Sequence, residues 1–127
     1  MVCLTKGARI GICTSVKNLK DELSMVKPTL FVSVPRLYNK FYDAMKKKIS
    51  KAGWVGKKVF DIAYAQRLEN ISKYNDYSSL LSFVFNKTKA VLGGRVCMMI
   101  TGSAPINADI KDFFRVTMGC PIVEGYG

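Results

Sequence analysis

The chain has 127 residues, of which 49% are hydrophobic, and a formal net charge of +11, enough sequence for one domain with a real core. This apolar content excludes a disordered basic tail, and no apolar run reaches the roughly 20 residues that span a bilayer. The first six residues lack the apolar stretch of a secretory signal, so we expect a globular, basic, intracellular protein.

Positive charge is concentrated in the middle of the chain. Between Arg36 and Lys89 there are twelve basic and four acidic residues, a net +8 of the total +11. Such a segment can attract a nucleic acid, an anionic membrane surface or a phosphorylated ligand. The simplest interpretation is a set of solvated helix faces, and charge alone selects no partner.

Four cysteines are present and histidine is absent. Without histidine, Ser-His-Asp triads and most zinc-site patterns are excluded. Cys13 closes one apolar run and Cys97 lies inside another, so we expect both thiols in the core. No Cys-x-x-Cys pair occurs, and four reduced thiols in an intracellular protein are the simplest expectation.

The first third of the chain alternates between strand and helix patterns. Residues 8–13 predict a short strand, and Asn18 is placed to cap the helix that follows it. The run TLFVSV at 29–34 is nearly all apolar or β-branched, which is typical of a strand covered on both faces in a parallel sheet. Pro35 then suits the start of a second helix. The apolar stripe of that helix is Leu37, Phe41, Met45 and Ile49.

The middle of the chain predicts two more helices. The sequence GWVG at 53–56 interrupts the helical pattern, and we expect Trp54 to anchor a loop there. The stripe of the next helix is Phe60, Tyr64, Leu68 and Ile71. The stripe of the last of these helices is Leu80, Leu81, Val84, Val91 and Leu92, and it ends at Gly93-Gly94.

The last third of the chain returns to strands. The run VCMMI at 96–100 predicts a buried strand, Asn107 can cap a short helix that Gly119 closes, and PIVE at 121–124 predicts a final strand. Strands separated by helices indicate an α/β fold, with a mostly parallel sheet flanked by helices.

Two loops leave the carboxyl ends of these last strands, where α/β proteins place ligands. The loop TGSAP at 101–105 has small residues that admit a flat ring or a phosphate, with the hydroxyls of Thr101 and Ser103 available. In the loop EGYG at 124–127, Tyr126 lies between two glycines and can stack on a base. Each loop alone fits an ordinary turn. Because strands one helix apart bring both loops to the same sheet edge, a crevice between them is the predicted ligand site.

These loops and other segments resemble the long-chain acyl-CoA synthetases of the adenylate-forming superfamily. The resemblance is carried by LGGRV at 92–96, MITGSAPI at 99–106 and GCPIVEGYG at 119–127, with GARIG at 7–11 and similar segments within 27–38 in the same order. It covers nearly the whole chain. It implies that residues 1–127 are a partial AMP-binding domain, an internal fragment of the large N-terminal domain truncated at both ends.

The resemblance implies a two-step ligase reaction. Family members use ATP and Mg²⁺ to convert a long-chain fatty acid to an acyl-adenylate and pyrophosphate, and the thiol of coenzyme A then displaces AMP to give acyl-CoA. The residues that would line one side of the ATP and acyl-adenylate pocket are Gly102, Ser103 and Ala104. The residues that would form the facing wall are Glu124, Gly125, Tyr126 and Gly127, with Tyr126 stacked on adenine.

Several parts of the family's machinery are not in this sequence. They are the Ser/Thr/Gly-rich phosphate loop with its lysine, the Thr-Glu that follows Tyr-Gly and holds Mg²⁺, and the mobile lid with its catalytic lysine. Stabilising the charge of the transferring phosphoryl group needs such groups. We therefore expect no catalytic residue and no metal ligand among the 127 residues, and no activity from this chain alone.

Two other functions stay open. One is a non-catalytic basic module or truncated paralogue that binds anionic lipid surfaces or polyanions; within the family resemblance itself, the lysines at 46–48 and 57–58 can touch anionic lipid, and Trp54 can border a fatty-acid channel or cover the membrane side. The other is a nucleic-acid binder, whose affinity would fall steeply with salt; no nucleic-acid motif is present, so we expect no such partner. The resemblance is also compatible with peripheral contact with an organelle membrane such as the endoplasmic reticulum, although no address signal is visible.

Overall fold

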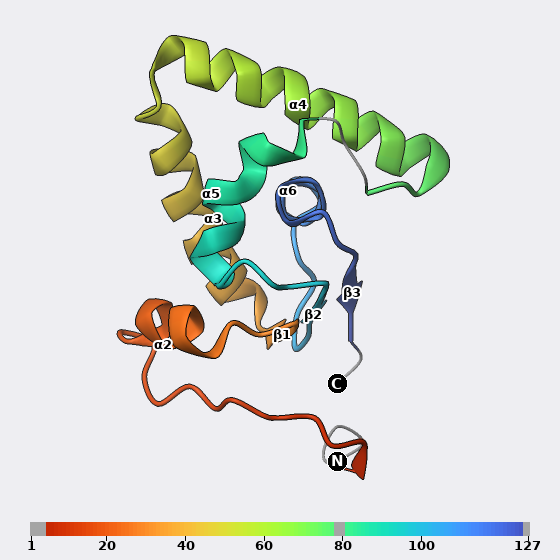
Figure 1. Cartoon of the computed structure of the whole chain (residues 1–127). Helices are drawn as coiled ribbons and strands as arrows, with labels where there is room; N and C mark the ends of the chain where they lie inside the picture. The colour runs from red at the N-terminus through yellow and green to blue at the C-terminus, as the bar shows by residue number, and fades with distance from the viewer. Residues whose placement is uncertain (1–4, 78–80, 126–127) are drawn as a thin grey trace.

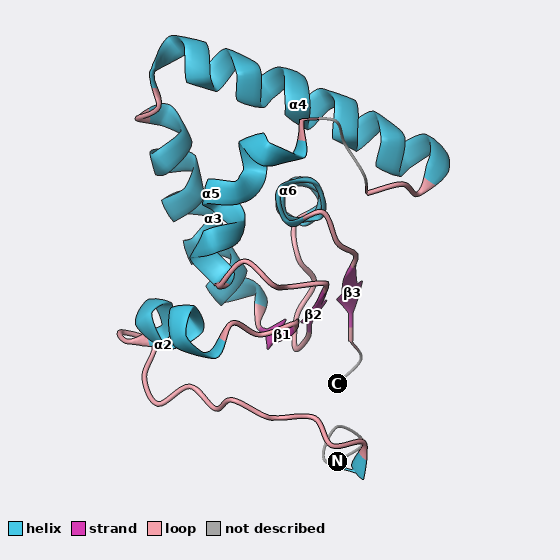
Figure 2. Ribbon diagram, in the orientation of Figure 1, coloured by secondary structure: helices cyan, strands magenta, loops and turns pink. Residues whose placement is uncertain are grey.

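A three-stranded parallel sheet forms the centre of the computed structural model, which describes residues 5–77 and 81–125. The strands, in their order across the sheet, are β1 (Leu30–Ser33), β2 (Met98–Thr101) and β3 (Ile122–Glu124). In the central strand, Met99 lies opposite Phe31 on one side and Ile122 on the other. The prediction of an α/β fold with a parallel sheet is confirmed (Figure 2).

Helices connect the strands and cover the sheet. The helices are α2 (Leu19–Val26), α3 (Pro35–Ser50), α4 (Gly53–Tyr74), α5 (Asn86–Lys89) and α6 (Ala108–Met118), with 3-10 segments η1 (Ser82–Phe85) and η2 (Ala90–Leu92). Helix α3 follows β1, and α6 joins β2 to β3. Helices α3, α4 and α6 pack against one another above the sheet (Figure 1).

The described helices cover only one face of the sheet. Phe31, Met99 and Ile122 point into the core and are at most 6% exposed, whereas Val32 is 63% and Val123 48% exposed. Successive side chains of a strand point to opposite faces, so the exposed residues belong to the uncovered face. The prediction that the strand within 29–34 is covered on both faces is therefore wrong for the described part of the chain.

Residues 8–13 form no strand, which corrects the prediction for this segment. All of them are exposed, and no described strand pairs with their backbone groups; Figure 1 shows an extended coil that leads to α2. Asn18 precedes α2 as predicted, but its side chain makes no capping bond because its backbone is already helical, with φ −94° and ψ −2°. Glu22 instead accepts hydrogen bonds from the N–H and the hydroxyl of Thr14.

Two predictions about the central helices are also corrected. Helix α4 begins at Gly53, so Trp54 lies in its first turn, 78% exposed, and anchors no loop. The single helix predicted after residue 80 is three short segments, η1, α5 and η2. The Thr88 hydroxyl donates to the Phe85 carbonyl across 2.7 Å, and such local bonds compete with a regular helix. Leu80 lies outside the described residues.

Aromatic side chains fill the core where α3, α4 and α6 meet. Tyr38 packs edge-on against Phe114 with ring centroids 5.3 Å apart, and Tyr42 packs against Phe113 in the same way at 4.8 Å. This is a favoured geometry for aromatic pairs. The apolar stripes predicted for α3 and α4 do face this core, and the members of both stripes are buried or half-buried.

The thiols lie where the sequence did not predict them. Cys13 and Cys97 are exposed, whereas Cys120 is buried, and all three are free. The Cys97 thiol donates to the Thr29 carbonyl across 3.2 Å, because both residues lie just before their strands at the rim of the sheet. Cys3 is outside the described residues.

Candidate functional site

The two predicted loops lie side by side at one edge of the sheet. Thr101 ends β2 opposite Glu124, the last residue of β3. Beyond that pair, the Gly125 N–H donates to the Thr101 carbonyl across 2.6 Å, and the Gly102 N–H donates to the Ser33 carbonyl of β1 across 3.3 Å. The prediction that strand order brings the loops together is confirmed for the residues that the structure describes.

Small residues keep the edge between the loops open. A Cβ atom added to Gly102 would have the Gly125 carbonyl oxygen as its nearest atom, 3.9 Å away, and one added to Gly125 would lie 3.5 Å from the Ile100 side chain. Ser103 and Ala104 are exposed. A ligand placed at this edge can therefore approach the backbone of both loops closely.

Ser103 has an uncommon backbone conformation for its residue type. Its φ is +72°, in the left-handed region that favours glycine. Residues held in this region cost of order 1–3 kcal/mol each and cluster at binding sites, where the surroundings fix them. The strain at Ser103 is an observation, independent of sequence motifs, that marks the loop at 101–105.

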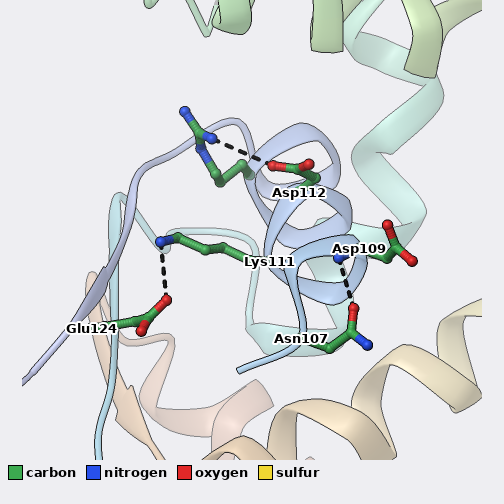
Figure 3. A network of polar contacts seen from close by, with 6 residues as sticks. Asn107, Asp109, Lys111, Asp112 and Glu124 are labelled. Atoms are coloured by element: carbon green, nitrogen blue, oxygen red, sulfur yellow. Dashed lines mark hydrogen bonds and ion pairs between the residues drawn. The ribbon is translucent and has the colours of Figure 1, made fainter. Parts of the chain in front are cut away.

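Glu124 is tied to the helix that connects the two loops. Its carboxylate lies 3.1 Å from the Lys111 ammonium of α6, and both side chains are partly exposed (Figure 3). The Asn107 side chain caps α6 by accepting the Asp109 N–H across 2.8 Å, as the sequence predicted. The start of α6 is therefore fixed beside the loop at 101–105, and its first turns hold the end of β3.

Not every predicted feature of the loops is found at this edge. The Thr101 hydroxyl is fully buried and has no hydrogen-bond partner among the described residues, because it shares the covered face of the sheet with Met99. It therefore offers nothing to a ligand at the edge, which corrects that prediction. Tyr126 and Gly127 lie outside the described residues, so their proposed roles stay predictions.

Sequence reasoning missed a buried cation at the carboxyl end of α6, the end away from the two loops. Arg67 is 1% exposed, donates to the Val116 carbonyl across 2.8 Å and has its guanidinium carbon 4.6 Å from the centre of the Phe85 ring. Burial lowers the pKa of Arg67, and burial followed by repulsion from Arg67 lowers the pKa of Lys89. Position 67 lies three residues after Tyr64, on the same face of α4 as its apolar stripe. The helical spacing could therefore have predicted that Arg67 is buried.

Comparison with known proteins decides the family. Residues 1–127 match the family described as AMP-binding enzyme over their whole length. The chain belongs to this family. The adjacent loops described above are thus part of an AMP-binding enzyme sequence.

Two curated relatives of this AMP-binding family member are named as long chain acyl-CoA synthetases. "Long chain acyl-CoA synthetase 7, peroxisomal" of Arabidopsis thaliana is 42% identical over 113 residues, which cover 88% of this chain and 16% of the relative. Long chain acyl-CoA synthetase 5 of the same plant is 37% identical over 126 residues, covering 95% of this chain and 19% of the relative. The chain therefore spans less than a quarter of the length of these relatives.

A solved structure supports the fold. The A-PCP didomain of carboxylic acid reductase from Segniliparus rugosus, in complex with AMP, matches with a TM-score of 0.56 and 21% identity. The match covers 92% of this chain and 14% of that chain. At this identity the likeness concerns the fold alone, and it supports the α/β arrangement described for this chain.

Within 5–77 and 81–125, no three His, Cys, Asp or Glu side chains come together as potential metal ligands, and Glu124 is already bound by Lys111. These residues do not fit a Mg²⁺ site. No helix in the described part of the chain is long and apolar enough to cross a membrane.

Proposed function

We propose that this chain forms the adenine-facing part of a long-chain fatty acid–CoA ligase, within a larger AMP-binding domain. In that reaction a carboxylate oxygen of the fatty acid attacks the α-phosphorus of ATP, and pyrophosphate leaves. The thiolate of coenzyme A then attacks the acyl carbon, and AMP leaves with the electrons of the broken C–O bond. The family and its curated relatives support this assignment.

One observation supports the proposal: the Gly125 N–H donates to the Thr101 carbonyl, so the two loops lie together at one edge of the sheet. In the proposed complex, Gly102, Ser103 and Ala104 line one side of the nucleotide, and the residues from Glu124 onward line the other, with Tyr126 on adenine. These residues bind and orient the acyl-adenylate, which contributes through positioning. Mg²⁺, when bound, would neutralise phosphate charge in the complete enzyme.

The proposal is tested with the native protein from its source. We expect an intact mass several times 14.2 kDa and acyl-CoA formation that depends on ATP, Mg²⁺, coenzyme A and a long-chain fatty acid. A native mass near 14.2 kDa without thioester formation would overturn the proposal. That result would favour the non-catalytic basic module.

A variant links this activity to the loops. Gly102→Ala adds one methyl group where the nearest atom is 3.9 Å away, so the fold accommodates it. Because the methyl group narrows the edge between the loops, we expect kcat/KM for ATP to fall about tenfold or more with an unchanged unfolding midpoint. Unchanged kcat/KM would contradict the placement of the nucleotide.

A further inference from the structure

The start of α4, next to the turn from α3, presents an apolar surface to solvent. Only Lys51 and Ala52 separate the two helices. The outward face of the first half of α4 includes Trp54, Val55, Val59 and Ile62, which are 78%, 56%, 39% and 57% exposed. The inward face of the same turns is also apolar. We call residues 46–62 the elbow.

The elbow is strongly basic. It contains six lysines and one carboxylate, that of Asp61. The lysines are Lys46, Lys47, Lys48, Lys51, Lys57 and Lys58. None of them is ion-paired within the described residues. Lys46, Lys47 and Lys57 border an open hollow of about 380 Å³ between the two helices, together with the carboxylate of Asp61. Lys57 and Lys58 are exposed in the same turns of α4 as the apolar residues, so positive charge borders the apolar face.

The elbow is remote from the candidate nucleotide site. Helix α3 starts directly after β1, whose Ser33 carbonyl accepts the Gly102 N–H, so its first residue lies beside the loops. Its 16 residues carry the chain about 24 Å away, at 1.5 Å per residue. Figure 1 shows the α3–α4 turn at the far end of the molecule from the ends of the strands.

We propose that the elbow docks on the surface of a bilayer that contains anionic lipids. Tryptophan is enriched at the membrane–water interface. Insertion of Trp54 there would also remove the exposed Val55 and Val59 side chains from water. Each lysine near an anionic surface contributes about 1 kcal/mol, which raises the partition coefficient about fivefold. The lysine stems can lie along the apolar face while the ammonium groups reach the headgroup phosphates. This inference is independent of the ligase proposal.

Charge and apolar contacts are tested separately with the full native protein. Vesicles of phosphatidylcholine alone are compared with vesicles that contain about one third phosphatidylserine. We expect binding to the anionic vesicles only, and at least a tenfold weaker partition coefficient for the triple variant Lys47→Gln/Lys57→Gln/Lys58→Gln. The matched control Lys6→Gln/Lys17→Gln/Lys20→Gln removes the same charge from exposed positions outside the elbow and should bind like the unmodified protein.

Insertion is tested by fluorescence. Trp54 is the single tryptophan of this sequence, and the difference between the spectra of the unmodified protein and Trp54→Phe isolates its emission. We expect a blue shift when anionic vesicles are added and weaker binding for Trp54→Ala than for Phe83→Ala, a control whose ring is 64% exposed.

Three outcomes would overturn the docking proposal. A Trp54 emission that is already blue-shifted without vesicles would show that protein covers the elbow. Equal binding of both triple lysine variants would show that the elbow charge is irrelevant. Binding that depends on the lysines but not on Trp54 would indicate a general polyanion surface. Ligase activity measured with soluble substrate should be unchanged in every elbow variant, so failure here is distinguishable from failure of the ligase proposal.

Discussion

The Tyr38 hydroxyl donates to the carbonyl oxygen of Ile100 across 3.0 Å, although the two residues are 62 positions apart. This bond joins α3 to β2 one residue before the strand ends at the candidate site. Burial raises the pKa of Tyr38, so the hydroxyl stays protonated and remains a donor at neutral pH. The bond therefore links helix packing to the position of the loop at 101–105.

Tyr38→Phe should lower the free energy of unfolding by about 1 kcal/mol, because the ring contacts persist while the hydroxyl's shared hydrogen bonds to the Ile100 and Phe31 carbonyls are lost. Urea unfolding of the native protein measures this change. Tyr42→Phe is the matched control, since its hydroxyl forms no hydrogen bond within the described residues, and it should change stability by less than about 0.5 kcal/mol. Equal effects of both variants would contradict the role of the Tyr38 bond.

The strained backbone at Ser103 predicts that a glycine variant is more stable than an alanine variant, the reverse of the usual order. Ser103→Gly relieves the left-handed backbone whereas Ser103→Ala keeps it, so the glycine variant should be more stable by about 1 kcal/mol. Both variants remove the hydroxyl and should lower ATP-dependent thioester formation. Thermal unfolding and the ligase assay measure the two effects.

Lys27 provides the control for this prediction, because its φ of +48° is also left-handed and it lies at the end of α2. Lys27→Gly should be more stable than Lys27→Ala, with ligase activity unchanged in both. If Ser103→Ala retained full activity, Ser103 would have no part in nucleotide binding.

The thiols should react in the order of their exposure. Cys13 and Cys97 are exposed and Cys120 is buried, so a maleimide at pH 7.5 should label the first two and leave Cys120 unmodified until the protein unfolds. Peptide mapping by mass spectrometry identifies the labelled residues. Labelling of Cys120 at the rate of Cys97 would contradict the described packing.

The Cys120 thiol makes the free energy of unfolding depend on pH in the alkaline range. Burial, followed by the influence of Cys97, raises the pKa of Cys120 from 9.0 to about 11. A group whose pKa is raised on folding contributes stability that is fully present below its unfolded pKa and is lost as pH rises. Stability should therefore fall between about pH 9 and pH 11, and less so in Cys120→Ala. Equal slopes in both proteins would contradict this coupling.

Elements with local chemical signals could be predicted from the sequence. Pro35 occupies the first turn of α3, and Asn107 caps α6 through its own side chain. The adjacency of the loop at 101–105 and residues 124–125 followed from the order of strands and helices, which constrains a parallel sheet strongly.

Features that depend on long-range contacts could not be predicted. Residues 8–13 have a strand-like pattern, but a strand forms only where a neighbour accepts its backbone hydrogen bonds, and no described strand does so. Cys97 lies in an apolar run at the sheet rim and is therefore exposed. The Lys111–Glu124 ion pair depends on how α6 returns to the sheet, and nothing local at Ser103 signals its positive φ.

The central claim is that the two loops form one nucleotide-facing edge, and photoaffinity labelling tests it most directly. The native protein is irradiated with 2-azido-ATP, with and without excess ATP, and the modified peptides are mapped. The account predicts ATP-protected labels within 101–105 or 122–127. Labels confined to the lysines of the elbow, with none in either loop, would contradict it and indicate a polyanion-binding surface instead.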